Sequence, residues 1–278
     1  MLESIRKKLS KNASLLNIWV IIHSFNAPLG VVVKNHKKLC GIRNAYKGKR
    51  CFIIGNGPSL KADDLDKIKD EYSFAANSIC KIFDRTDWRP SFYCVQDEKV
   101  LANLGEDLFA GGKVARSTFI RLNSYKNIRN DIDKLGDLFF VPIIQFKLKN
   151  EGVRFSKRID LYAGDGWTVT YMAIQLAAYM GFKEICLLGV DHSFPFERKK
   201  DGSVVIKDLN IPAHFYESAA DNVKGEPPRK RANFNERVTN GYIAAEEYSR
   251  KTGRFRIYNC TRGGALEVFE RKNLEDVL

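Results

Sequence analysis

The sequence lacks the cysteine spacing of a protein built around disulfides or structural zinc. Its six cysteines include no Cys-x-x-Cys pair, and most of them lie inside apolar runs such as CFIIG and EICLLGV. In such runs cysteine packs as a small hydrophobic residue. We therefore expect a reducing compartment, with neither a disulfide framework nor a zinc framework.

Long apolar runs are scarce. The run LLNIWVII falls short of the twenty apolar residues that span a bilayer. Polar and turn-forming residues interrupt or follow it, namely Asn17, His23, Ser24, Asn26 and Pro28. No small-residue cleavage site follows it, which argues against a secretory signal. The sequence indicates a cytoplasmic protein.

Acidic residues are outnumbered, which gives a formal charge of +13. This balance favours an anionic partner, whether a nucleotide, a nucleic acid or an acidic membrane surface. Aromatic residues do not alternate with the basic ones as they do in single-strand-binding grooves, so nucleic acid is disfavoured.

Much of the net positive charge lies in the first 48 residues, where Glu3 is the only acidic residue. We interpret residues 1–48 as a basic amphipathic arm. One reading is that it lies on an anionic membrane, on the inner face, as a peripheral anchor. The other is that it is a helical arm packed on the domain or on a second subunit of a homo-oligomer.

The rest, residues 49–278, is predicted to be one nucleotide-binding domain. Continuous apolar runs at 50–54 and 184–190 are typical of parallel strands buried on both faces. Further strands are expected at 72–77, 91–95 and 255–259, with weaker candidates at 113–115 and 138–141, and helices at 62–68, 168–181 and 240–251. This order predicts a Rossmann-like, doubly wound, mostly parallel α/β sheet. The polar stretch 194–236 is predicted to be a lid or loop insertion.

The turn GNGPSL after the first strand is the leading candidate for a phosphate site. Gly55 and Gly57 allow the backbone to approach a ligand, Asn56 tolerates a left-handed conformation, and Ser59 offers a hydroxyl. The turn is neither GxGxxG nor a Walker loop, and a purely structural strand-to-helix turn is the alternative.

Other candidates follow other strands. Asn77 suits a base edge or a ribose hydroxyl, although a turn residue is the plainer reading. Asp191, beside His192, is a candidate base or magnesium ligand, or caps a turn. His214, in the expected lid, is a candidate acid–base group or a surface histidine. Arg262 and Gly263 form a second glycine turn that suits phosphate.

Four blocks in order resemble the MptE-like family, named after archaeal 6-hydroxymethylpterin diphosphokinase. They are FIIGNGPSL, AANSI, GDGWTVTYMAIQLAAYMGFKEICLLGVDHSF and IYNCTRGGALEVFER. The resemblance spans roughly residues 49–278, and it implies a role in surface polysaccharide synthesis for bacterial members.

A more distant resemblance is to bacterial lipooligosaccharide sialyltransferases, which use CMP-sialic acid. It implies nucleotide contacts at five positions: Asn56, Gly57, Ser59, Asn77 and Thr168. Two positions depart from that pattern. Arg237 stands where the catalytic histidine is expected, and Asp165 stands where an arginine is expected.

Three functions follow as hypotheses. The first is a transferase, a glycosyltransferase with a nucleotide-sugar donor and a glycan or lipid-linked acceptor, in which Arg262 stabilises the leaving group and Asp191 or His214 is the base. The second is a diphosphokinase that uses ATP, with Asp191 binding Mg²⁺. The third is a non-catalytic protein that binds a nucleotide or a glycan.

Overall fold

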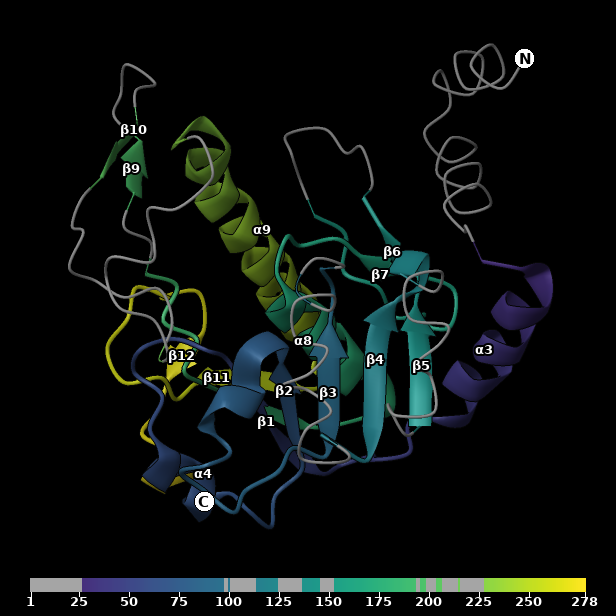
Figure 1. The fold of residues 1–278 in the computed structure, drawn as a ribbon, viewed down its shortest axis with the longest axis horizontal. Helices are drawn as coiled ribbons and strands as arrows, with labels where there is room; N and C mark the ends of the chain where they lie inside the picture. Colours follow the sequence, from purple (N-terminus) through teal and green to yellow (C-terminus); the bar gives the residue numbers. More distant parts are fainter. Residues whose placement is uncertain are drawn as a thin grey trace.

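Seven neighbouring strand pairs, all parallel, join eight strands into one sheet. This computed structural model describes residues 27–97, 100, 114–124, 137–145, 153–193, 196–198, 204–206, 215 and 228–278. The sheet order, from one edge to the other, is β12 (Glu270–Arg271), β11 (Arg256–Asn259), β8 (Glu184–Leu188), β1 (Arg50–Ile54), β2 (Ser73–Ala76), β3 (Phe92–Val95), β4 (Ser117–Arg121) and β5 (Asp137–Val141) (Figure 1). The predicted doubly wound α/β sheet is confirmed.

The strand order reverses at β1. From β1 the chain proceeds outward through β2, β3, β4 and β5, and then returns to place β8 on the other side of β1. Strands β11 and β12 continue in that second direction. In open parallel sheets, ligands bind beyond the carboxyl ends of the strands at such a reversal. The ends of β1 and β8 therefore mark the place to look for a site.

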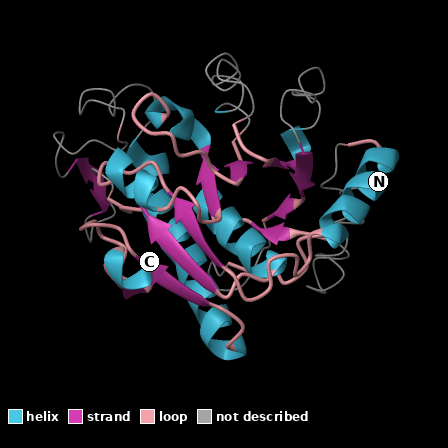
Figure 2. Ribbon diagram, turned by 90° about the horizontal axis from the view of Figure 1, so that it is seen from below, coloured by secondary structure: helices cyan, strands magenta, loops and turns pink. Residues whose placement is uncertain are grey.

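Each strand at the centre of the sheet buries both of its faces. On one face Cys51 and Ile53 pack with helices α8 (Val169–Met180) and α9 (Pro228–Thr252). On the other face Phe52 and Ile54 pack with α4 (Ala62–Lys67) and the short 3₁₀ helix η1 (Asn77–Ile82). Figure 2 shows helices on both sides of the strands. Two covered faces explain why the strands are continuously apolar.

Helix α8 illustrates how local sequence sets the boundaries of an element. The Thr168 hydroxyl accepts a hydrogen bond from the Thr170 amide at the N-terminus, and Gly181 ends the helix with φ of 90°. A hydroxyl cap and a left-handed glycine are the usual start and stop of a helix. The predicted helix at 168–181 is thus confirmed.

Helix α3 (Leu29–Gly41) covers the edge strand β5. The Asn35 side chain donates to the Phe140 carbonyl at 2.7 Å and accepts from the Phe140 amide at 2.8 Å. Lys38 Nζ donates to the Leu138 carbonyl at 2.7 Å. These bonds satisfy backbone groups that an open edge would offer to another chain. Residues 29–41 of the expected arm therefore pack on the sheet (Figure 1), and residues 1–26 lie outside the described residues.

Two elements differ from the sequence prediction. Strand β4 starts at Ser117, and the described residues Val114 and Ala115 of the expected strand 113–115 precede it without strand structure. Helix α9 begins at Pro228 and not near residue 240, so the last part of the expected insertion is helical. Within that insertion, β9 (Phe196–Arg198) and β10 (Val204–Ile206) pair antiparallel.

The smaller described elements are β6 (Ile143–Ile144), β7 (Ala163–Gly164), η2 (Leu122–Ser124) and η6 (Glu275–Val277). A search for membrane spans over the described part of the chain found no helix with the length and hydrophobicity to cross a bilayer.

Candidate functional site

A cavity of about 680 Å³ opens at the carboxyl ends of the strands, where the strand order reverses. Its walls come from the ends of β1, β2, β3, β4 and β8, the N-terminus of α8, and one face of α9. The residues that line it include Gly55, Asn56, Gly57, Asn77, Gln96, Asp97, Arg121, Asp165, Trp167, Thr168, Thr170, Gly189, Asp191, His192, Val238 and Tyr242. Five of the predicted nucleotide-site residues and Asp191 are therefore brought together.

The amides of the GNGPSL turn are largely engaged within the protein. The Gly55 amide donates to the Leu188 carbonyl and the Gly57 amide to the Gly189 carbonyl, both at 2.8 Å, and the Leu60 amide donates to the Gly57 carbonyl. The Ser59 amide and hydroxyl both donate to the Asp191 carboxylate. These hydrogen bonds fasten the turn after β1 to the end of β8. They leave few of its amides to bind a phosphate.

Two amide oxygens at the floor of the cavity are buried without a hydrogen-bond partner among the described residues. They are Oδ1 of Asn56 and Oδ1 of Asn77. The Asn56 amide group is fixed, because its Nδ2 donates to the Ala76 carbonyl at 3.0 Å. An unsatisfied buried acceptor costs about 1–3 kcal/mol. The floor therefore suits a ligand that supplies hydroxyl or amino donors.

Asp191 holds the turn in place. Its Oδ2 accepts from Ser59 Oγ at 2.8 Å, and its carboxylate lies so close to Gly57 that a Cβ there would overlap with it. Burial raises the pKa of Asp191, and the hydrogen bonds from Ser59 partly offset that rise. The capping role weighed for Asp191 is the arrangement that the structure displays.

His192, directly after Asp191, lies on the cavity wall against α9. Its Nε2 lies 2.8 Å from Oγ1 of Thr239, and that hydroxyl donates its single proton to the Asn235 carbonyl at 2.8 Å. Nε2 must therefore be the donor, which leaves the lone pair of the neutral ring on Nδ1. Burial lowers the pKa of His192 below its usual 6.5 and favours this neutral form.

Arg121 ends β4 and brings a positive charge into the cavity. Its Nε is buried and has no hydrogen-bond partner among the described residues. Strand β4 is three strands from β1, roughly 14 Å at the usual spacing. Arg121 and Asn56 therefore lie at different parts of the cavity. Sequence reasoning missed Arg121 because the strand was placed too early in the chain.

The N-terminus of α8 forms another wall. Asp165 Oδ1 accepts from Gln96 Nε2 at 3.1 Å and from the Trp167 amide at 2.9 Å. The Trp167 ring stacks under the Arg237 guanidinium at 4.5 Å. The partial positive charge of a helix N-terminus favours an anion. Thr168 therefore lies where a phosphate is favoured.

Backbone strain gathers at this cavity. Four non-glycine residues in the described part of the chain have a positive φ, and three of them line the cavity: Asn77 (50°), Trp167 (61°) and His192 (52°). A left-handed conformation is costly for a residue as bulky as tryptophan. Strain of this kind tends to persist at functional sites, so its position supports the cavity as the site.

Three predicted residues that the structure describes do not line the cavity: Ser59, Arg262 and Gly263. Arg262 pairs with Asp64 of α4, and neither Arg262 nor Gly263 lines the cavity; both border a separate hollow of about 400 Å³. The neighbouring Gly264 instead packs against the Asp191 backbone. His214 lies outside the described residues.

Comparison with known proteins places the chain in a family. The family described as "6-hydroxymethylpterin diphosphokinase MptE-like" matches residues 29–197, which is more than half of the chain. The chain belongs to the MptE-like family. A search of curated protein sequences found no match.

One matching solved structure is that of the MAf glycosyltransferase from Magnetospirillum magneticum AMB-1. The identity is 15% and the TM-score 0.48, over 99% of this chain and 42% of that one. This chain thus spans less than half of that protein. The MptE-like match includes GNGPSL, Asn77, Thr168 and Asp191, whereas Thr239 and Tyr242 of α9 lie beyond it.

Proposed function

We propose that this MptE-like chain is a nucleotide-dependent transferase, and that it transfers a sugar from a nucleotide-sugar donor to a hydroxyl group of a glycan or lipid-linked acceptor. The observation that carries the proposal is the set of unsatisfied polar atoms that share one cavity: Oδ1 of Asn56, Oδ1 of Asn77 and Nε of Arg121. Two buried acceptors and one buried cationic donor match a ligand that carries both hydroxyl or amino groups and an anionic group.

The nucleoside is assigned to the floor of the cavity. Its ribose hydroxyls or base amino group donate to Asn56 and Asn77, which gives these two oxygens the partners that they lack within the described chain. The phosphate is assigned to the N-terminus of α8 at Thr168, and not to the amides of the GNGPSL turn, because most of those amides are already bonded. Arg121 takes a second anionic group of the donor at the far end.

His192 is assigned the role of general base. The acceptor hydroxyl oxygen attacks the anomeric carbon, its proton passes to Nδ1 of His192, and the nucleotide leaves with the electrons of the broken glycosidic bond. Thr239 positions the ring by accepting from Nε2. A neutral imidazole is required for this step, and the lowered pKa of His192 supports it at neutral pH.

Diphosphate transfer from ATP is the second candidate, favoured by the description of the family. That reaction needs magnesium, which commonly binds through one or two carboxylates together with the phosphates of the substrate. Three carboxylates line the cavity, those of Asp97, Asp165 and Asp191. Asp191 is held by Ser59, and Asp165 accepts from Gln96 and Trp167. Within the described ranges no three acidic, histidine or cysteine side chains converge in the cavity. We therefore rank sugar transfer first, and magnesium binding at Asp97 or Asp191 is what the second candidate would require.

A thermal-shift screen tests the proposal. CMP, UDP, GDP and ATP would each be added with and without Mg²⁺, since a ligand at a hundredfold excess over its Kd stabilises by about 2.7 kcal/mol. Metal-independent stabilisation by CMP, UDP or GDP supports sugar transfer. Stabilisation by ATP only with Mg²⁺ supports the kinase. If no nucleotide stabilises the protein, the proposal is wrong, and binding without turnover of any sugar donor indicates a binding protein.

A further inference from the structure

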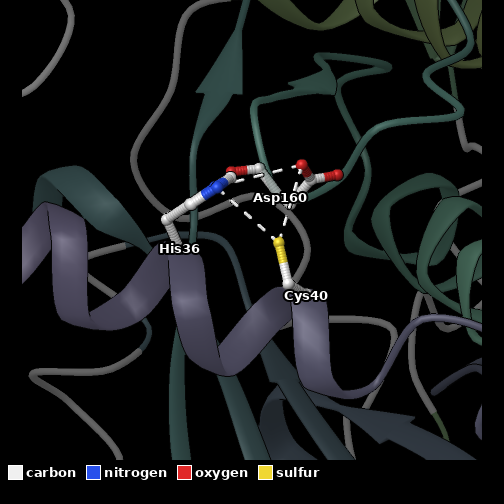
Figure 3. A group of neighbouring side chains, drawn as sticks. All are labelled: His36, Cys40 and Asp160. Carbon is white, nitrogen blue, oxygen red and sulfur yellow. Dashed lines mark hydrogen bonds and ion pairs between the residues drawn. The ribbon is translucent and has the colours of Figure 1, made fainter.

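A cluster of three metal-binding side chains lies well away from the strand ends, beside the edge of the sheet. His36 and Cys40 are one helical turn apart on α3, and Asp160 comes from the segment before β7 (Figure 3). Residues at positions i and i+4 of a helix share a face. His36 Nε2 lies 3.6 Å from Cys40 Sγ, and Sγ lies 4.0 Å from Asp160 Oδ2. A nitrogen, a sulfur and an oxygen ligand thus face one another.

The His36 ring is oriented as metal-binding histidines usually are. Its Nδ1 lies 3.0 Å from the main-chain carbonyl oxygen of Asp160. A carbonyl can only accept, so Nδ1 carries the proton and the lone pair of Nε2 points toward Cys40. A backbone carbonyl that fixes the second ring nitrogen is a recurrent feature around histidine ligands.

The spacing of the ligand atoms fits zinc. Tetrahedral zinc with bonds of about 2.0–2.1 Å to nitrogen and about 2.3 Å to sulfur separates the two ligand atoms by about 3.6 Å. The observed separation of Nε2 and Sγ is 3.6 Å. An oxygen ligand belongs about 3.6 Å from the sulfur and about 3.4 Å from the nitrogen. Sγ lies 4.0 Å from Asp160 Oδ2, and all three ligand atoms lie within 4.8 Å of one another, so the carboxylate must move closer to complete the site.

We propose that His36, Cys40 and Asp160 bind a divalent zinc-like cation that ties α3 to the segment before β7. Water completes the fourth position, because Cys40 is exposed and the His36 side chain is 42% exposed. Binding replaces the thiol proton of Cys40 with the metal and releases that proton to solvent. The ion thereby fastens the helix that covers the edge strand β5.

The Asp160 carboxylate is kept ionised by Arg158, and Arg158 also occupies both of its oxygens. The Asp160 side chain is only 2% exposed, and Arg158 Nε donates to both carboxylate oxygens at 2.9 and 3.0 Å. Burial alone would raise the pKa of Asp160, but the hydrogen bonds and charge of Arg158 outweigh it and lower the pKa. Arg158 competes with the cation, so affinity is expected to be lower than in a closed four-ligand site.

The test uses the full chain, reduced with a non-chelating phosphine. Zn²⁺ would be titrated against a chromophoric chelator, and Co²⁺ would be followed by its thiolate charge-transfer absorption. We expect one ion per chain, a higher melting temperature with Zn²⁺, and at least about tenfold weaker binding in Cys40→Ser and in His36→Gln. Cys80→Ser, which removes another partly exposed cysteine, is the matched control and is expected to bind as the wild type does.

Three outcomes would overturn the assignment. They are the absence of a cobalt–thiolate band, equal binding in the wild type and Cys40→Ser, or equal losses in Cys40→Ser and Cys80→Ser. The two single-ligand variants keep the Arg158–Asp160 ion pair, so circular dichroism should confirm that both remain folded. A variant at Asp160 is avoided, because it would remove a buried carboxylate and break its ion pair with Arg158.

Discussion

Arg262 and Asp64, 198 residues apart in the sequence, form a two-point ion pair between the turn after β11 and α4. The Asp64 carboxylate is 4% exposed, and Arg262 Nη1 donates to it at 2.6 Å. The pair joins a residue near the start of the domain sequence to one near its end, beside the GNGPSL turn. Both terminal nitrogens of Arg262 are engaged by this carboxylate, so Arg262 has less charge and fewer donors to offer a phosphate.

Replacement of Arg262 by alanine is therefore expected to lower stability and to leave nucleotide affinity unchanged. Loss of a charged hydrogen-bond partner leaves Asp64 unsatisfied, which costs about 1–3 kcal/mol. Thermal unfolding and nucleotide titration would be compared with Arg85→Ala, which removes an exposed ion pair. If Arg262→Ala instead loses much of its affinity for the nucleotide and keeps its melting temperature, Arg262 contacts the leaving group after all.

Asn77→Gly separates binding from strain. Glycine adopts a positive φ without steric strain, and this relief offsets the extra entropy that glycine gives the unfolded chain, so the variant is expected to be within about 1 kcal/mol of the wild type in stability. Loss of the Oδ1 acceptor is expected to weaken nucleotide binding about tenfold. Asn44→Gly, at an exposed residue with φ of 57° outside the cavity, is the control. Equal affinity of both variants in calorimetry would refute the assignment of Asn77.

Arg121→Gln is expected to weaken binding of the anionic ligand by about 10–100-fold, because a charge-assisted hydrogen bond in a buried site is lost. The dependence of affinity on salt concentration should also become shallower. Arg116→Gln removes an exposed arginine just before β4 and should change neither property. The titrations would use both a free nucleotide and its sugar conjugate, and unchanged affinity for both would exclude Arg121 from the site.

His192 should show its tautomer and its pKa directly in nitrogen-detected NMR, in a chain with only four histidines. We expect the proton on Nε2 and a titration below pH 6.5, because burial lowers the pKa. Thr239→Val removes the acceptor and should shift the tautomer balance toward Nδ1, whereas Thr239→Ser should not.

The same pKa shift makes stability depend on pH with a defined sign. The unfolded state takes up a proton at His192 before the folded state does, so this contribution to stability is complete above pH 6.5 and is lost as the pH falls below it. Transfer activity that needs the neutral ring should fall over the same range, and His192→Asn should lower kcat by about 10²–10⁴-fold. A His192 signal that titrates above 6.5 would contradict both expectations.

The sheet was predictable because its central strands carry a pattern that few other structures share. Cys51–Ile54 and Ile185–Leu188 are apolar at every position, which requires cover on both faces, and Gly181 marks where α8 ends. Strand β4 was misplaced because Ser117 and Thr118 look like surface residues, although both are buried in the sheet. The first turns of α9 escaped notice because the sequence from Pro228 to Thr239 has no apolar periodicity.

The position of the candidate site could be predicted from the sequence, but the roles of its individual residues could be predicted less well. Residues that directly follow apolar strands, such as Asn56 and Asp191, had to meet where the strands end. Which of them hold a ligand depends on hydrogen bonds that cross the fold, as between Ser59 and Asp191 or Arg262 and Asp64. The His36–Cys40–Asp160 cluster was missed because it uses one cysteine, and its third member is 120 residues away from that cysteine.

The reversal of strand order at β1 also governs how the chain must fold. Cys51 of β1 pairs with Ile185 of β8. During synthesis, more than a hundred residues must therefore follow β1 before β8 can pair with its second side. Until then an apolar strand stands at the edge of a nascent sheet, open to pairing with another chain. The cavity takes its walls from the ends of β1 to β4 and from the end of β8. A fragment that stops short of β8 should therefore aggregate during synthesis, and the ligand can bind only after the most distant strand pairing of the sheet core has formed.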